Sequence, residues 1–169
     1  MVRFAILFFV ILVAAFAAEL TPPVQRAIVE PWTSFVAKAS TSLMQVFDPA
    51  VMVNGPTIIS KENGFGVTIL AGCNGLEAMI VLLAAILAFP ARWKHKLVGL
   101  AAGILAIQLL NFVRIASLFY LGQWSPTAFE WAHLYVWQVL IMLDALIVFL
   151  VWLRSLPRVP LTPDGVAAA

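Results

Sequence analysis

The residues best able to do covalent chemistry in this sequence are one cysteine, one arginine and one histidine. Cys73 is the only cysteine, which disfavours a disulfide framework, a CxxC pair or a quinone-coupled thiol oxidase. Arg114 lies inside a long apolar run, where a guanidinium costs about 2.5 kcal/mol or more. His133 begins another apolar run and could move protons. A nucleophile, a base and a group that stabilises negative charge are the minimum set for acyl transfer.

The thiol lies in the segment AGCNGLEAM, where an extended stretch is expected to give way to a helix. The flanking Gly72 and Gly75 allow a sharp strand-to-helix turn. Asn74 is predicted to be the helix N-cap, with Glu77 completing a capping box. The positive end of the helix favours thiolate, whereas the charge of Glu77 opposes it. The alternative is that Cys73 is a small apolar side chain at a helix end.

Two further polar residues inside apolar runs are predicted to support the site. Asn111 and Arg114, one turn apart, should face protein rather than lipid, although Arg114 could instead snorkel to the headgroups. Asp144 stands eleven residues after His133, about 16 Å along one helix. We expect a structural role for it, through a hydrogen bond to Gln108 at the same depth. His133 could also belong to an aromatic belt.

Composition indicates that these residues belong to a membrane protein. Of 169 residues 63% are hydrophobic and 11% charged, and the mean hydropathy is +1.03, whereas soluble domains are about half apolar and a quarter charged. The histidines are too far apart to form a zinc site with the single cysteine, so no metal or cofactor is expected. The small net charge of +2, with basic residues at helix ends, makes nucleic acid an unexpected partner.

Four apolar runs predict an all-α, polytopic transmembrane bundle of about four spanning helices, because a span needs about 20 mostly apolar residues. The predicted spans are residues 2–20, 74–93, 97–121 and 132–153. They form a single domain, 1–154, followed by a cytoplasmic tail, 155–169, predicted to be disordered. The first run, which follows Arg3 and ends in AFAAE, also fits a cleaved signal peptide.

The basic residues predict the orientation. A cytoplasmic N-terminus puts the basic residues that flank the runs on the cytoplasmic side: Arg3, Arg92, Lys94, Lys96, Arg154 and Arg158. The outer loop of residues 21–73 is then extracytoplasmic, and Cys73 and His133 lie at the outer surface. Arg114 is about 9 Å below the outer end of its helix. Three helices are therefore expected to bring the three groups to one level.

The outer loop has predicted structure of its own. Apolar residues at spacings of three and four indicate an amphipathic helix on the membrane surface: Ile28, Trp32, Phe35, Ala39, Leu43 and Val46. Three short β-prone pieces follow, VMV, TII and FGVTIL, separated by turn residues around Gly55 and Gly64. They predict a small extracytoplasmic β-hairpin.

At these residues the sequence resembles the exosortase and archaeosortase family of membrane enzymes, and exosortase H in particular. The family's cysteine, arginine and histidine match Cys73 in AGCNGLEAM, Arg114 in LLNFVRIASLFYLG and His133 in FEWAHLYVWQ, in the same order. The likeness covers Gly66 to Arg154 well and the N-terminal third loosely. Many exosortases have about eight spans, so about four would leave less scaffold around the same core.

The resemblance implies a cysteine peptidase or transpeptidase of the bacterial inner membrane whose site faces the periplasm. Its partners would be membrane-anchored proteins with a C-terminal sorting signal: an IPTLxxWG-like motif, a transmembrane helix and a basic cluster. Cys73 would form a thioester, His133 would move protons and Arg114 would stabilise thiolate or oxyanion. The acyl acceptor, the cleavage site and the oligomeric state stay open.

Two other functions also stay open on the sequence. A non-catalytic transport or assembly subunit could line a polar path with Arg114 and Asp144. A lipid acyltransferase could use the same thiol. Substitution of Cys73 separates the enzymes from the subunit, and the group trapped on the thiol separates peptide from lipid chemistry.

Overall fold

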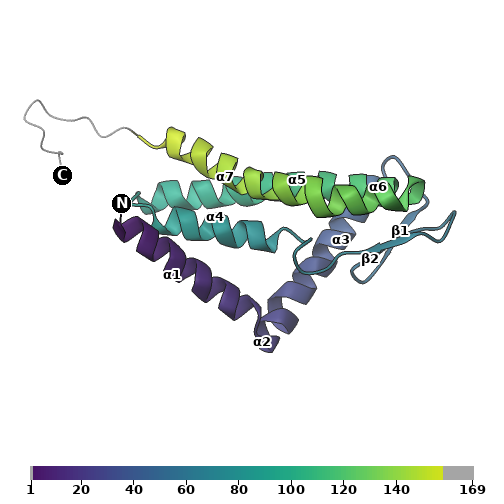
Figure 1. Cartoon of the computed structure of the whole chain (residues 1–169), viewed down its shortest axis with the longest axis horizontal. Coiled ribbons are helices and arrows are strands. Elements are labelled where there is room, and N and C mark those ends of the chain that lie inside the picture. Colours follow the sequence, from purple (N-terminus) through teal and green to yellow (C-terminus); the bar gives the residue numbers. More distant parts are fainter. Residues whose placement is uncertain (1, 158–169) are drawn as a thin grey trace, which may run out of the picture.

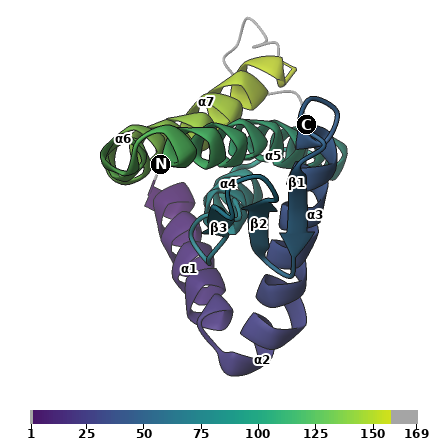
Figure 2. The ribbon, with the colours of Figure 1, turned by 90° about the vertical axis from the view of Figure 1, so that its right-hand side faces the viewer.

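The structure, a computed structural model, describes residues 2–157. It is mostly helical, with one small antiparallel sheet (Figure 1 and Figure 2). In chain order the elements are α1 (Val2–Glu19), α2 (Pro22–Val24), the π-helical segment η1 (Gln25–Val29), α3 (Glu30–Met44), β1 (Val51–Asn54), β2 (Thr57–Ser60), β3 (Gly66–Thr68), α4 (Leu76–Ala88), α5 (Trp93–Trp124), α6 (Pro126–Trp131), the π-helical segment η2 (Ala132–Val136) and α7 (Trp137–Ser155). The predicted disorder of the C-terminal tail falls almost wholly on residues 158–169, outside the described residues.

Among the described residues, three helical stretches are long and apolar enough to cross a bilayer, rather than the four predicted: α1, α5 and the continuous Pro126–Ser155. The expected span of residues 74–93 is instead α4, which has 13 residues and a length of about 20 Å. It starts late because Gly75 has φ +77°, outside the helical region. It ends early because Pro90 disfavours helical backbone at Phe89, which has ψ 136°.

α4, α5 and α7 pack around an apolar core that includes Leu82, Ile107 and Trp152, and α1 packs against α4. Glycines of α5 permit this close approach, because a Cβ at Gly99 would overlap the Trp152 ring and one at Gly103 would overlap Leu82. Most of the remaining apolar side chains of α1, α5 and α7 are exposed. An apolar exterior of this kind suits lipid rather than water.

Both ends of the described chain lie at one end of the bundle, and the sheet lies at the other (Figure 1). The start of α1, the end of α4 and the last turns of α7 meet there in a set of aromatic contacts. Phe89 lies 6.0 Å from Phe4 and 5.8 Å from Trp152 between ring centroids. Arg3 and Arg154, which stand near these helix ends, therefore lie at the end of the bundle opposite the sheet. Basic residues on one side are expected when successive helices cross the membrane in alternating directions.

The predicted amphipathic helix is present as α3, and its apolar stripe is the exposed face. Ile28 before it and Phe35 and Leu43 within it are exposed, whereas the small side chains of Ala37 and Ser40 are buried. The buried face packs on the sheet and α5 around Ile58 and Phe119, among other side chains. The helix thus has a protein-facing side as well as a side suited to lipid, and it ends at Met44, before Val46.

The sheet has three antiparallel strands in the order β1-β2-β3, one from each of the three β-prone pieces from which a small hairpin was predicted. The β1–β2 turn contains Gly55 with φ +57°, and the β2–β3 connection contains Gly64 with φ +72°. The first of the three β-prone pieces therefore pairs with the second, and the second with the third. The third strand, β3, leads directly toward the cysteine.

Candidate active site

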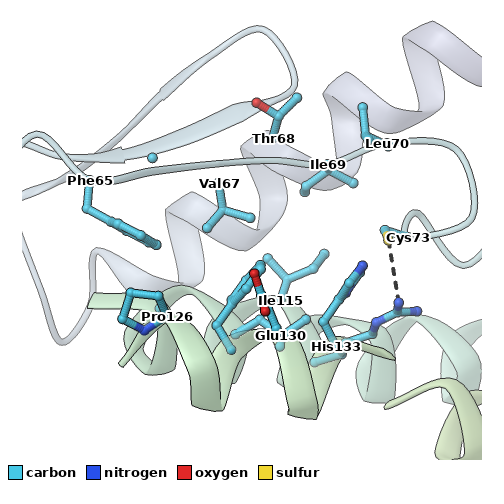
Figure 3. Close-up of a pocket in the computed structure, with 15 residues that line it drawn as sticks. Phe65, Val67, Thr68, Ile69, Leu70, Cys73, Ile115, Pro126, Glu130 and His133 are labelled. Carbon is cyan, nitrogen blue, oxygen red and sulfur yellow. Dashed lines mark hydrogen bonds between the residues drawn. The ribbon is translucent and has the colours of Figure 1, made fainter. Parts of the chain in front are cut away.

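Cys73, Arg114 and His133 line one cavity of about 390 Å³, between the β3 segment on one side and α5, α6 and η2 on the other (Figure 3). The other walls are largely apolar, with Val67 and Ile69 from the β3 segment and Leu118 and Phe129 from the helices, among others. The three residues named from the sequence therefore come together in space, although they are separated by up to sixty positions in the chain. The volume of the cavity falls in the range of about 300–1,000 Å³ that is usual for ligand-binding sites.

The turn that presents Cys73 depends on two glycines. Gly72 has φ +86° and Gly75 has φ +77°, a backbone region in which other residues are strained. Between them, the Cys73 N–H donates to the Leu70 carbonyl at 3.0 Å. The sharp turn expected from the sequence is present, and Cys73 lies three residues before α4 begins, at Leu76, rather than within its first turn.

The predicted capping box is wrong. Gly75 is the N-cap of α4, and no side chain caps the helix. Asn74 Oδ1 instead accepts from the Leu76 N–H at 2.9 Å, which stabilises the turn before the helix. Glu77 lies against the turn on its other side, because a Cβ added at Gly72 would be 3.3 Å from Glu77 Oε1. The N-cap is therefore Gly75 rather than the predicted Asn74, because Gly75 takes the left-handed conformation and the helix begins only after it.

Asn74 fixes the turn to two other helices. Its side chain is fully buried, and Nδ2 donates to Thr33 Oγ1 at 2.9 Å. Its main-chain carbonyl accepts from Trp32 Nε1 at 3.2 Å and from Gln108 Nε2 at 3.3 Å. Asn74 therefore positions the residue next to the thiol from α3 and α5, without reaching into the cavity itself.

Arg114 is the cation beside the thiol. The side chain is 2% exposed; Nη2 donates to Cys73 Sγ at 3.4 Å and Nη1 to the Gly72 carbonyl at 3.5 Å. Nε is buried and has no hydrogen-bond partner among residues 2–157. A buried guanidinium with an unused donor is costly unless it meets negative charge. It is placed to stabilise a thiolate or an oxyanion formed at Cys73, and it does not snorkel to solvent.

Burial raises the pKa of the Cys73 thiol above its ordinary value, the charge of Arg114 lowers it, and the charge of Glu77 raises it. Burial is the largest of the three effects, so the net pKa is raised. The net balance of burial and charge therefore opposes thiolate in this site, although Arg114 favours it. Because the thiol is protonated near neutral pH, the chemistry needs a base at the moment of attack.

His133 is the imidazole on the wall of the same cavity. It lies in η2, the π-helical segment between α6 and α7, an irregularity often found at functional sites. Its ring stacks on Phe129 with 5.7 Å between centroids and an interplanar angle of 10°. In Figure 3 the ring projects into the cavity on the side of the Cys73 thiol. Its Nδ1 is buried without a hydrogen-bond partner in the described part of the chain.

The supporting residues are less directly connected to the cavity. Asn111 is fully buried below the turn, and its Nδ2 donates to Gln108 Oε1 at 3.5 Å. The predicted Asp144–Gln108 hydrogen bond is absent from residues 2–157, because Gln108 Nε2 donates to Asn74 O and Met79 Sδ instead. Asp144 Oδ2 is buried with no partner among the described residues.

Sequence reasoning missed two parts of the cavity. Glu130, an exposed residue three positions before His133, contributes to the wall; only its helical spacing from the histidine could have indicated it. The segment from Phe65 to Leu70 forms the opposite wall. The sequence predicted that this segment forms a strand. It did not predict the contact with the helices, because that contact joins residues far apart in the chain and produces no local sequence pattern.

A family model described as transmembrane exosortase matches residues 2–155. The matched range contains α1 to α7 and all three residues that meet at the cavity. No curated protein and no solved structure matches the chain.

Proposed function

This chain belongs to the transmembrane exosortase family, and on that premise we propose that it is a membrane-embedded cysteine peptidase or transpeptidase that cuts C-terminal sorting signals. The observation that carries the proposal is the 3.4 Å contact between the buried Arg114 Nη2 and the Sγ of the only cysteine. His133 on the wall of the same cavity supplies the remaining group needed for acyl transfer.

The proposed reaction has two halves. In the first, the Cys73 thiol gives its proton to His133 while Sγ bonds to the scissile carbonyl carbon, and Arg114 donates to the resulting oxyanion. The carbon–nitrogen bond then breaks as His133 returns the proton to the leaving amine, which leaves a thioester. In the second half, water or an amine attacks the thioester, loses a proton to His133, and releases the Cys73 thiol.

The proposed substrates are exported proteins that end in an IPTLxxWG-like motif, a transmembrane helix and a basic cluster, as for exosortase H. Arg3, Arg92 and Arg154 stand at helix ends that lie at the end of the bundle opposite the sheet (Figure 1), which supports cytoplasmic termini and a site at the periplasmic face of the inner membrane. A substrate helix could then lie beside the bundle, with its preceding motif at the level of Cys73.

The proposal is tested by trapping the intermediate. Incubation of the purified full chain with a sorting-signal substrate, followed by rapid acid quench, is expected to give a hydroxylamine-sensitive adduct on Cys73. Mass spectrometry should identify the attached group as the N-terminal part of the substrate. A fatty acyl group on Cys73 would point to lipid acyl transfer instead, and the absence of any adduct alongside normal cleavage would contradict a thioester mechanism.

A second expectation concerns the pH dependence of the thiol. Because burial raises the pKa of Cys73 above its ordinary value, the thiolate fraction at neutral pH is small and grows as the pH rises. The rate of iodoacetamide alkylation of this single cysteine should therefore have its midpoint at a higher pH than that of an unburied cysteine. Arg114→Gln removes the charge that favours thiolate, so it should move the midpoint higher. A midpoint below about 8.5, the value of a free thiol, would contradict this electrostatic balance.

A further inference from the structure

Among the described residues, no strand pairs with the edge of β3 that faces away from β2, so this edge is open. Within the sheet, Phe65 O accepts from the Ser60 N–H at 2.8 Å, and the Ile69 N–H donates to Pro56 O at 3.0 Å. Val67 lies between them and pairs with Ile58. Because antiparallel pairing uses alternate residues, the intervening Gly66 and Thr68 direct their main-chain N–H and C=O away from β2.

This open edge belongs to the wall of the candidate active site. The residues from Phe65 to Leu70 line the same cavity as Cys73 and His133. The chain then reaches the thiol five residues after Thr68, and the Leu70 carbonyl accepts the Cys73 N–H. In Figure 3 the strand runs along the cavity toward Cys73, opposite the helix that carries His133. Unpaired strand edges are templates for an additional strand.

We propose that the substrate segment preceding the scissile bond binds as an added strand on the edge of β3. The inference rests on the proposed function, and it identifies how that site recognises its substrate. The main-chain groups of Gly66 and Thr68 bond the peptide backbone. Alternate substrate side chains then point into the apolar cavity beside Val67, Ile69 and Leu118, and the others point away from it.

The strand is added parallel to β3. The substrate's membrane helix follows its motif, so the polypeptide must run from the sheet end toward the helical bundle as it passes Cys73. β3 runs in the same direction, because the chain continues from Thr68 through Leu70 to Cys73 and then enters α4 (Figure 1 and Figure 3). In a parallel ladder, the N–H and C=O of one residue form hydrogen bonds with the two residues on either side of the residue that faces it. Gly66 and Thr68 of β3 are each expected to bond two substrate residues in this way.

The test is a backbone scan of the substrate. The probe is a synthetic peptide with the IPTLxxWG-type motif, an apolar helix and a basic cluster, N-methylated at one position at a time before the scissile bond. With the purified full-length chain, kcat/KM is expected to fall about tenfold or more at every second position, where an N–H would bond β3. The intervening positions should change less than about threefold, since their N–H groups point away.

An enzyme variant provides an independent measurement. Thr68→Pro removes one outward N–H while the β2–β3 bonds, which use neighbouring residues, remain; proline is tolerated at such edge positions. It should lower kcat/KM about fivefold to tenfold. Thr57→Val is the matched control, since it removes the hydroxyl pair between Thr57 and Thr68, 3.0 Å apart, and retains every strand N–H. Alkylation of Cys73 checks that each variant keeps its folded site.

The outcomes separate the inference from the function on which it rests. Normal, Cys73-dependent cleavage with no alternation in the N-methyl scan would overturn strand addition and leave the peptidase intact. A chain that never cleaves the unmodified peptide would contradict the proposed function, and strand addition with it. If Thr68→Pro loses its fold, the N-methyl scan decides alone, because it uses the unaltered chain.

Discussion

The Cys73→Ala chain is expected to insert stably in the membrane and to leave sorting-signal substrates uncut. The substitution removes only Sγ from a partly exposed residue, so the loss of folding stability should be small. Processing should fall by at least about a thousandfold, because removal of a covalent nucleophile leaves only binding and electrostatic effects. The ratio of full-length to cut substrate in membranes, measured by immunoblot, gives the result.

Cys73→Ser is the companion variant. It keeps the size and hydrogen-bonding capacity of the side chain but replaces the thiol with a far weaker nucleophile, so it should be nearly as inactive as alanine. Normal cleavage of the substrate in Cys73→Ala membranes would contradict the peptidase proposal and favour a non-catalytic transport or assembly subunit. Protease protection of the outer loop would establish that both variants are inserted as the parent is.

The Arg114→Lys chain is expected to lose activity by about a hundredfold or more, the cost of removing one donor from an oxyanion site. Lysine keeps the charge, but a single ammonium cannot reproduce the paired contacts of Nη1 with Gly72 O and Nη2 with Cys73 Sγ. It also supplies no equivalent of the unused Nε. Single-turnover cleavage measured per folded molecule should show a lower rate constant for thioester formation.

Lys96 offers a matched control in the same helix. It is also a buried cation, with 8% exposure and a 2.7 Å bond from Nζ to Leu87 O, but it lies near the other end of α5. Lys96→Met should therefore affect stability more than chemistry. Equal loss of rate in both variants would assign Arg114 a structural role. Full activity of Arg114→Lys would show that charge alone is sufficient.

The raised thiol pKa and the arginine contact have a joint consequence for mechanism. Burial raises the pKa of Cys73, which favours the protonated thiol, and a protonated thiol is oxidised less readily than a thiolate. In the proposed mechanism Arg114 acts most strongly when negative charge appears, on sulfur during deprotonation and on oxygen during attack. Such a site would stabilise charge only as the reaction creates it, and the proposed mechanism assigns the proton transfer to His133.

Patterns that extend along a segment were readable from the sequence. The run of apolar residues around Arg114 predicted most of α5, because a span of that length has few alternative structures in a membrane. The β-prone pieces marked all three strands, because turn residues separate them. The pairing of Cys73 with Arg114 was inferred from their predicted level in the membrane, and level alone cannot tell which side chains face each other.

The predictions that failed depended on local geometry that neighbouring elements decide. Asn74 has the sequence pattern of a helix cap, but contacts from Thr33 and Gln108 hold it in the turn before α4. That arrangement also takes the Gln108 amide away from Asp144. Each of these bonds joins residues more than thirty positions apart, so no periodicity within a segment could encode them.

The sequence by itself indicated that the chain lies in a membrane, because its long apolar runs require a bilayer. It also indicated the helices and the candidate reactive groups, since a lone thiol, a guanidinium within an apolar run and an imidazole limit the possible chemistry. Only the tertiary structure decided that Arg114 contacts the thiol, that burial keeps the thiol protonated, and that the open edge of β3 lies along the same cavity. The physical reason is that hydropathy and spacing act within a segment, whereas distance, burial and charge at the site arise where separate segments meet.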